Sequence, residues 1–277
     1  MSGLPTSTVT ASAPRARGAQ SSAARNRALL VNFARRELTT RYLGSVSGLA
    51  WALLNPLALL AVYQFVFTHI FKATAFAGQS FITFVAVALW PWLAVQEGLQ
   101  RGTVSLGSYA GMIRKVAFPH EIVVLASVLA TFALQFAGYL AVLVVLALAG
   151  EPVHLTGLIV AIPVWGVVIV AVLGLTFALA ALQVFVHDVE HMLMPILMIL
   201  MYLTPILYPL SLVPGNLRAF VAANPFSWVV ARLREALLEG RIAFHASDAV
   251  ALVVALLLLA GGHWVFRRLS PHFEDFV

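Results

Sequence analysis

The chain has 277 residues, of which 61% are hydrophobic and only 10% are charged. Soluble domains carry about 25% charged residues, so this composition excludes a water-exposed surface of ordinary size and predicts an integral membrane protein. Cysteine is absent, which excludes disulfides and thiolate metal sites. The net charge of +6 is spread around apolar runs, so we expect membrane lipid and not nucleic acid as the partner of the basic residues.

The N-terminal part of the chain divides into two segments. Residues 1–27 are rich in Ser, Ala, Thr and Arg and contain no acidic residue, and we expect a disordered cytoplasmic tail, with a transit peptide as the alternative. In residues 28–42, apolar residues recur at helical spacing while Arg35 and Arg36 point elsewhere. This pattern predicts an interfacial amphipathic helix in the membrane surface. A helix packed on the protein's own cytoplasmic face is the alternative interpretation.

The remainder, residues 43–277, contains six apolar runs and is predicted to be an all-α domain of six membrane-spanning helices. Most Lys and Arg residues lie before the first run, between the second and third, or after the last, which predicts cytoplasmic termini. Prolines within the runs predict kinks, and Gly166 and Gly174 predict close helix approach in the fourth run. The six predicted spans are residues 49–71, 81–96, 122–149, 158–186, 192–208 and 249–266.

Residues 97–121 separate the second and third spans and carry Arg101, Arg114 and Lys115. Three cations are costly in hydrocarbon, so we expect this segment on the cytoplasmic side, with Glu97 and Arg101 paired at helical spacing. Its centre is short, weakly amphipathic and interrupted by glycines. We interpret it as the docking site of a separate ATP-hydrolysing subunit. The alternative is a basic loop that only fixes the topology.

Residues 213–242 are too charged to cross the membrane. Asn224 is expected to cap a helix that starts at Pro225. We therefore expect short re-entrant or surface helices at the outer side.

Several kinds of chemistry are missing from the sequence. No lysine follows a glycine, so the chain lacks a P-loop. Most predicted spans lack ionisable residues at their middle, which argues against ion-coupled transport, so energy is expected from another chain. A metal site at residues 187–191 is weighed and not favoured, because polar residues belong in an inner turn. A membrane glycosyltransferase remains a weaker alternative, because the outer carboxylates Glu151, Glu235, Glu239 and Asp248 are not in a paired setting.

Motifs along the chain resemble those of the ABC-2-type polysaccharide-export permeases, the membrane subunits of O-antigen, capsule and teichoic-acid exporters. The similarity covers about residue 28 to the end, and the O-antigen branch is favoured. The matching stretches are Arg36-Glu37-Leu38, Arg41-Tyr42, Gly44-Ser45-Val46, residues 49–56 ending in Asn55-Pro56, Trp90-Pro91-Trp92, residues 114–119, residues 205–209, Val213-Pro214 and Asn224-Pro225 with Arg234 downstream. His187 stands where the family often has arginine.

The resemblance implies a six-helix half-transporter of the bacterial inner membrane that dimerises and exports a lipid-linked polysaccharide. Two copies of a nucleotide-binding ATPase subunit would hold ATP and Mg, so this chain would be no enzyme and bind no cofactor. An exporter of another lipid or a drug is the main alternative. The implied and proposed site residues are Ser105, Leu106, Tyr109, Arg114 and Lys115 for coupling to the ATPase, Arg35, Arg36 and Arg41 for substrate phosphates, Trp51, Tyr63 and Phe67 for the channel lining, and Pro205, Tyr208, Pro209, Asn224 and Pro225 for an outer gate.

Overall fold

A computed structural model describes residues 22–42, 50–70, 80–113, 115 and 118–276, and all regular elements within these ranges are helical. Predictions that fall on residues 1–21, 43–49, 71–79, 114 and 116–117 lie outside the described residues. The elements are α1 Ser22–Tyr42, α2 Ala50–Phe65 with the π-helix η1 Val66–Ile70, α3 Phe81–Ser108, α4 Ala110–Ile113, α5 Glu121–Leu148, η2 Leu155–Gly157, α6 Leu158–Phe185, α7 Asp188–Leu203, η3 Leu210–Leu212, α8 Gly215–Ala223, α9 Pro225–Leu237, α10 Ala246–Leu269, η4 Ser270–His272 and α11 Phe273–Phe276.

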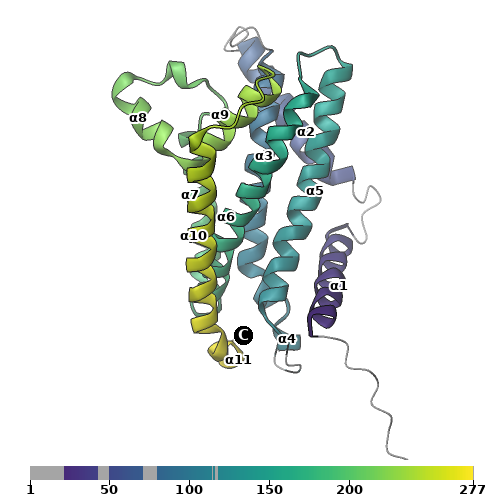
Figure 1. Ribbon diagram of the computed structural model, residues 1–277. Coiled ribbons are helices and arrows are strands. Elements are labelled where there is room, and N and C mark those ends of the chain that lie inside the picture. The colour runs from purple at the N-terminus through teal and green to yellow at the C-terminus, as the bar shows by residue number, and fades with distance from the viewer. Residues whose placement is uncertain (1–21, 43–49, 71–79, 114, 116–117, 277) are drawn as a thin grey trace, which may run out of the picture.

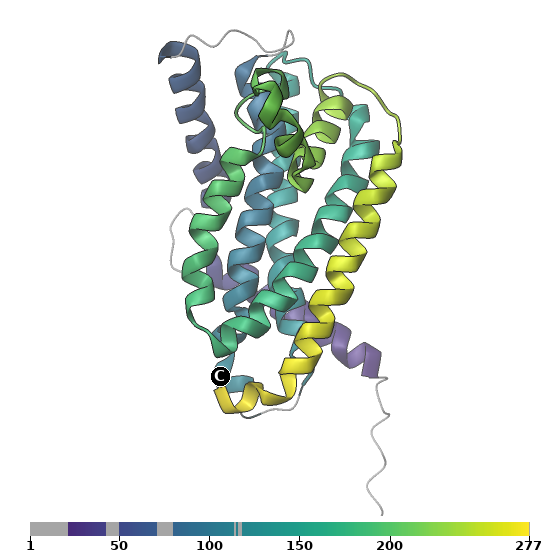
Figure 2. The same cartoon turned by 90° about the vertical axis from the view of Figure 1, so that its left-hand side faces the viewer.

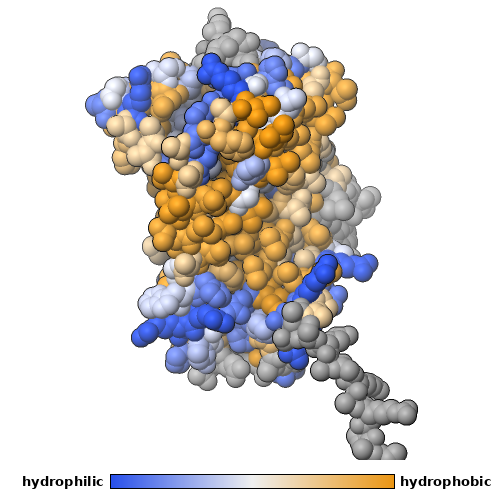
Figure 3. Space-filling model, viewed as in Figure 1, coloured by the Kyte–Doolittle hydropathy of each residue, from blue (hydrophilic) through white to orange (hydrophobic). Residues whose placement is uncertain are grey.

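The long helices run side by side along one axis, with α8 and α9 at one end and α1, α4 and α11 at the other (Figures 1 and 2). An apolar band crosses the middle of the visible face, and hydrophilic residues gather toward both of its ends (Figure 3). This is the surface expected of a protein that spans a bilayer. We call the end with α4 and α11 the inner end and the end with α8 and α9 the outer end, after the orientation predicted from the basic residues.

Four helices are long and apolar enough to cross a membrane: Phe81–Ser108, Glu121–Leu148, Leu155–Phe185 and Ala246–His272. The apolar stretch Leu54–Ile70 of α2 and η1 is shorter, and α7 has 16 residues. Both pack against α3, one of the four longer helices. The all-helical membrane fold is therefore confirmed, and the count of six spans stays a prediction for these two segments.

Helix α3 lies at the centre of the bundle and is buried along most of its length. Pro91 lies inside it and has no N–H for the carbonyl oxygen of Val87. The hydroxyl of the fully buried Tyr139 in α5 donates to that oxygen at 3.2 Å. One tyrosine thus replaces the missing backbone donor, and α3 remains helical through the proline.

The two glycines of the fourth span behave differently. A Cβ at Gly174 would lie 2.4 Å from the backbone carbon of Leu258, and one at Gly262 would lie 1.8 Å from the oxygen of Gly174. Helices α6 and α10 therefore touch backbone to backbone here, as predicted for Gly174. At Gly166 a Cβ would meet no atom of the described residues within 4 Å, so no close approach to another helix is seen there within one copy of the chain.

Two predicted boundaries need correction. Helix α1 begins at Ser22, so the last residues of the predicted disordered tail are helical. Helix α3 continues past the predicted span end at residue 96 to Ser108. It can do so because Glu97 accepts hydrogen bonds from Arg101 in the next turn and from Gln135 in α5, both at 2.6 Å. The predicted Glu97–Arg101 pair is confirmed, but it lies within a continuous helix.

Helix α1 crosses the inner part of the bundle obliquely and packs against α5 (Figure 2). Its Phe33 is 6% exposed and belongs to a cluster with Tyr109 and Phe273 at the inner end. Helix α1 is thus packed on the protein itself. Its exposed face, which includes Arg35 and Arg36, remains open to a membrane surface.

Candidate functional site

The described residues from Ser105 to Lys115 form a bend at the inner end, which we call the inner elbow. Helix α3 ends at Ser108, and Tyr109 turns the chain into the single helical turn α4. The Tyr109 N–H donates to Leu106 at 3.0 Å, and the carbonyl of Tyr109 accepts from Met112 at 2.9 Å. The bend is therefore fixed by backbone hydrogen bonds on both sides of one residue.

Only part of the inner elbow faces outward. The side chains of Ser105 and Leu106 are 4% and 1% exposed, and the Ser105 hydroxyl donates to the backbone of Gly102 at 2.7 Å. These two predicted coupling residues thus face the bundle and support the bend from inside. Arg114 lies outside the described residues. The surface that an approaching protein would meet is formed by Gly107, Ser108, Gly111 and Lys115.

Tyr109 joins the inner elbow to α1. Its ring packs edge-on against Phe33, with the centroids 5.0 Å apart, and the guanidinium carbon of Arg36 lies 5.1 Å above it. Burial raises the pKa of the Tyr109 hydroxyl, Glu37 adds to the rise, and Arg36 opposes it. The phenol is neutral at physiological pH and serves as an aromatic contact between the two elements.

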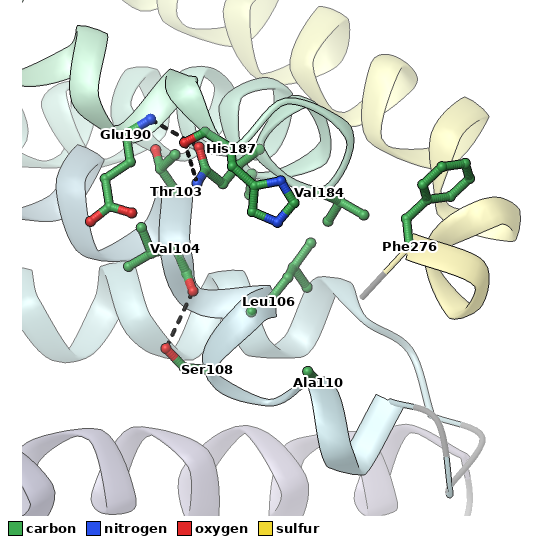
Figure 4. A pocket seen from close by; sticks show the side chains of 12 residues that line it. Thr103, Val104, Leu106, Ser108, Ala110, Val184, His187, Glu190 and Phe276 are labelled. Carbon is green, nitrogen blue, oxygen red and sulfur yellow. Dashed lines mark hydrogen bonds between the residues drawn. The ribbon is translucent and has the colours of Figure 1, made fainter.

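A cavity of about 500 Å³ lies between the inner elbow and the turn that joins α6 to α7 (Figure 4). Ser108 and Ala110 line one side, and His187, Glu190 and Phe276 line the others. The α6–α7 turn is held in shape by Gln183, which donates to the carbonyl of His187 at 3.1 Å and accepts from the N–H of Glu190 at 2.9 Å. An open pocket therefore separates the elbow from the α6–α7 turn.

The residues predicted for substrate phosphates lie on α1. Arg35 and Arg36 are exposed, whereas the Arg41 side chain lies outside the described part of the structure. The guanidinium of Arg36 also lies over the ring of Tyr109. Arg35 is therefore the described residue of the three whose guanidinium is most open to an anionic ligand.

The predicted lining residues of α2 do not gather at one place. Trp51 is 47% exposed at the start of the helix, Tyr63 is half-buried against the core, and the ring of Phe67 stacks on Phe81 at 4.8 Å. Nearby, the buried side-chain oxygens of Gln64 and Thr68 have no hydrogen-bond partner among the described residues. These two positions are four apart in an apolar run, a signal that the sequence analysis missed.

The predicted gate residues lie at the outer end, where α7 gives way to a loop and then to α8 and α9. The side chain of Asn224 accepts from the N–H of Phe226 and donates to Thr204, both at 3.0 Å. The predicted cap with Pro225 in the first turn is confirmed. Tyr208 donates to the carbonyl of Tyr202 at 2.8 Å. The loop around Pro205 and Pro209 is thus attached to both α7 and α9.

Arg234 of α9 holds this loop against α3. It donates to the carbonyl oxygens of Pro205 and Ile206 at 2.7 Å each and to that of Phe84 at 3.2 Å. Its guanidinium carbon lies 3.4 Å from the centre of the Phe84 ring. Burial lowers the pKa of Arg234 to about 9, so the group keeps its charge at neutral pH. From the sequence, Arg234 was recognised only as part of a motif, and its contacts with the loop and α3 were not predicted.

The outer carboxylates accept hydrogen bonds from neighbouring side chains. Asp248 accepts from Arg232 at 2.8 Å and from the Trp228 indole at 3.2 Å, and Glu235 also pairs with Arg232. Glu151 accepts from the hydroxyls of Ser80 and Thr83 at the start of α3. Asp248 thus joins α10 to α9, and Glu151 joins the segment after α5 to the start of α3.

Comparison with known proteins places this helical bundle in a family. The sequence profile of the ABC-2 type transporters matches residues 29–238. The chain is 29% identical over 262 residues to the O-antigen export system permease protein of Myxococcus xanthus, which covers 90% of this chain and 95% of that protein. It is 24% identical to the O-antigen export system permease protein of Klebsiella pneumoniae, over 89% and 94%. Identity to the polysialic acid transport protein of Escherichia coli is 23%, over 84% and 90%. The chain belongs to the ABC-2 type transporter family.

Proposed function

We propose that the chain is the membrane-spanning permease subunit of an ABC transporter that exports a lipid-linked polysaccharide of the O-antigen type. A separate ATPase subunit supplies the energy, and two copies of each subunit form the transporter in a bacterial inner membrane, with both termini in the cytoplasm. The observation that carries this proposal is the similarity to O-antigen export permeases over nearly the full length of both proteins.

In this proposal the inner elbow receives the motion of the ATPase. Its exposed residues Gly107, Ser108, Gly111 and Lys115 offer a small, positively charged docking surface. The cavity behind Ser108 and Ala110 leaves space for an inward shift. Displacement of Tyr109 would be passed to α1 through Phe33 and Arg36 and to the centre of the bundle through α3.

The substrate path in this proposal follows α1 and α2. Arg35 and Arg36 meet the phosphates of the carrier lipid at the inner side, because arginine binds phosphate through several N–H donors. The rings of Trp51 and Tyr63 stack on sugars. The oxygens of Gln64 and Thr68, which are buried in this conformation, accept hydrogen bonds from sugar hydroxyls once movement of the segment exposes them. A second copy of the chain completes the channel on the open side of α2.

The test uses the full-length chain with its candidate ATPase. Replacing Arg114 and Lys115 by Glu should abolish co-purification of the ATPase and the stimulation of ATP hydrolysis by the permease. The matched control is Arg241→Glu, an exposed charge reversal at the outer end. Unchanged pull-down and ATPase activity in the double variant would refute docking at the elbow. Transport of O-antigen by purified permease without any ATPase would refute the proposal as a whole.

A further inference from the structure

A groove of about 820 Å³ runs along the inner half of the bundle between α1, α5, α6 and α10. Its walls are apolar and include Leu125, Phe177, Leu256 and Leu259. It lies apart from the inner elbow, and neither the predicted coupling residues nor α2 and α7 contribute to it. Its volume falls in the range of ligand sites, about 300 to 1,000 Å³.

The mouth of the groove at the inner end is polar and mainly basic. Arg27 of α1 and Arg267 of α10 line it together with Glu121 and the imidazole of His263. Arg267 is 70% exposed, and its contact with Glu121 is long, at 3.4 Å. Since a guanidinium carries five N–H donors, most of those on Arg267 are available to another anion. The mouth thus holds two cations against one carboxylate.

Polar and apolar residues follow one another in order along the α10 side of the groove. Arg267, His263, Leu259 and Leu256 succeed each other at steps of three or four residues and therefore lie on one face of the helix. At 1.5 Å per residue this stripe is about 16 Å long, close to half of the roughly 30 Å of hydrocarbon in a bilayer. A cationic group, then an imidazole, then aliphatic side chains match the order of phosphate, glycerol and acyl chain in a phospholipid.

Asn26 provides a further polar contact at the mouth. Its side-chain oxygen is buried and has no hydrogen-bond partner among the described residues. Buried acceptors are nearly always paired, so a donor is expected beside it. A lipid headgroup that carries a hydroxyl next to its phosphate would supply that donor after a rotation of the Asn26 side chain exposes its oxygen to the groove, while the phosphate meets the two arginines.

We infer that this groove binds one anionic glycerophospholipid of the inner leaflet, of the phosphatidylglycerol type. Its phosphate contacts Arg27 and Arg267, its headgroup hydroxyl donates to Asn26, and one acyl chain lies against Leu256 and Leu259. The bound lipid fills the space between α1 and α10 and so fixes the N-terminal half of α1 against the bundle. The site concerns membrane lipid and does not depend on which substrate is transported.

The experiment is a titration of the purified full-length chain with palmitoyl-oleoyl phosphatidylglycerol, followed by native mass spectrometry. The variant pair Arg27→Gln with Arg267→Gln should weaken retention of the lipid about tenfold or more, given the contribution of each basic contact. The control pair Arg25→Gln with Arg268→Gln removes the same charge from the neighbouring positions, which do not line the groove. It should change retention less than about twofold. Equal weakening by both pairs would show a diffuse charge effect and overturn the proposal.

A second pair of variants tests the groove itself. Ala260 lines the groove, so Ala260→Trp should block retention of the lipid. Leu257 is exposed and does not line the groove, so Leu257→Trp should leave retention unchanged. Phosphatidylcholine should be retained far less than phosphatidylglycerol by the unmodified chain. Equal retention of the two lipids would overturn headgroup recognition. Displacement of phosphatidylglycerol by a polyprenyl diphosphate would assign the groove to the carrier lipid instead and would likewise overturn the proposal.

Discussion

The cations at the two ends of the molecule are used in different ways. At the outer end, Arg232 is 3% exposed and pairs with two carboxylates, and Arg234 donates to three backbone carbonyls. At the inner end, Lys115 and Arg35 are exposed, and Arg36 rests on the face of one aromatic ring. Arg232 and Arg234 therefore hold helices together at the outer end, whereas Lys115, Arg35 and Arg36 at the inner end leave most of their donors to a partner or a membrane.

This difference indicates which part of the protein is rigid. The outer arginines connect α9 to α3, to the loop after α7 and to the start of α10, so these elements move as a unit if they move at all. The inner elbow is attached through Tyr109 and has a cavity behind it. We expect substitutions at the outer end to lower stability and substitutions at the inner end to affect coupling.

The largest loss of stability is expected for Arg234→Gln. A buried carbonyl left without a donor costs about 1–3 kcal/mol. The loop carbonyls of Pro205 and Ile206 would lose this donor, whereas Phe84 lies within α3, so the free energy of unfolding should fall by about 2 kcal/mol or more. Arg234→Lys should recover only part of this, because an ammonium cannot reach three acceptors in a fixed fork. Unfolding of the purified protein in detergent measures the effect. The exposed Arg241 is the control, and equal losses for Arg241→Gln and Arg234→Gln would contradict the comparison.

A smaller loss is expected for Asp248→Asn. The substitution keeps the shape of the side chain but removes one of the two carboxylates that pair with the buried Arg232. Glu235 remains, so we expect a loss of about 1–2 kcal/mol in the free energy of unfolding. Glu239→Gln serves as the matched control, because its ion pair with Arg241 is exposed and should contribute less than about 1 kcal/mol. A loss no greater than that of the control would show that the ion pair between Arg232 and Asp248 does not stabilise the fold.

Much of the fold was predictable because apolar length is a strong signal. The predicted runs 81–96, 122–149, 158–186 and 249–266 correspond to the four helices that are long and apolar enough to cross a membrane. The Asn224 cap was found from two residues in sequence. The end of α3 was misplaced because the segment from Glu97 onward was expected to lie outside the hydrocarbon, whereas Gln135, 38 positions away, helps to satisfy Glu97 within the bundle. A contact between residues that are far apart in the sequence cannot be recognised from the local residue pattern of either helix.

The candidate site was less predictable for the same reason. Basic residues and glycines located the inner elbow, but not which of its residues face outward, since Ser105 and Leu106 proved to be buried. Asp248 gave no sequence signal for its pairing, because it and Arg232 come from different helices. Glu235 lies three residues after Arg232 in α9, so that pair could have been predicted from helical spacing. The spacing of Gln64 and Thr68 was visible in the sequence, but their lack of partners was not.

Arg36→Ala should have a modest effect on stability. An exposed cation over an aromatic ring contributes about 0.5–1 kcal/mol, so this is the loss expected for Arg36 and not for its neighbour Arg35, for which no such ring contact is described. A double-mutant cycle with Tyr109→Leu measures the interaction directly, since the two losses should not add. Additive losses would show that Arg36 does not act through the ring and that α1 is joined to the elbow by Phe33 alone.

The smallest change in stability is expected for Lys115→Glu. Lys115 is exposed and no contact with a carboxylate is described for it, so its replacement should alter the free energy of unfolding by less than about 0.5 kcal/mol. The ATPase partner should raise the unfolding temperature of the unmodified permease by mass action, and it should fail to do so for the variant.

The same variant distinguishes docking from a role in topology. Because the chain has no cysteine, a single cysteine at the exposed Ser108 can be labelled without interference. A membrane-impermeant maleimide should reach it only from the cytoplasmic side, with or without Lys115→Glu. If the label reaches the variant from the periplasmic side, Lys115 orients the chain, and the difference between the two ends reflects insertion into the membrane and not coupling to an ATPase.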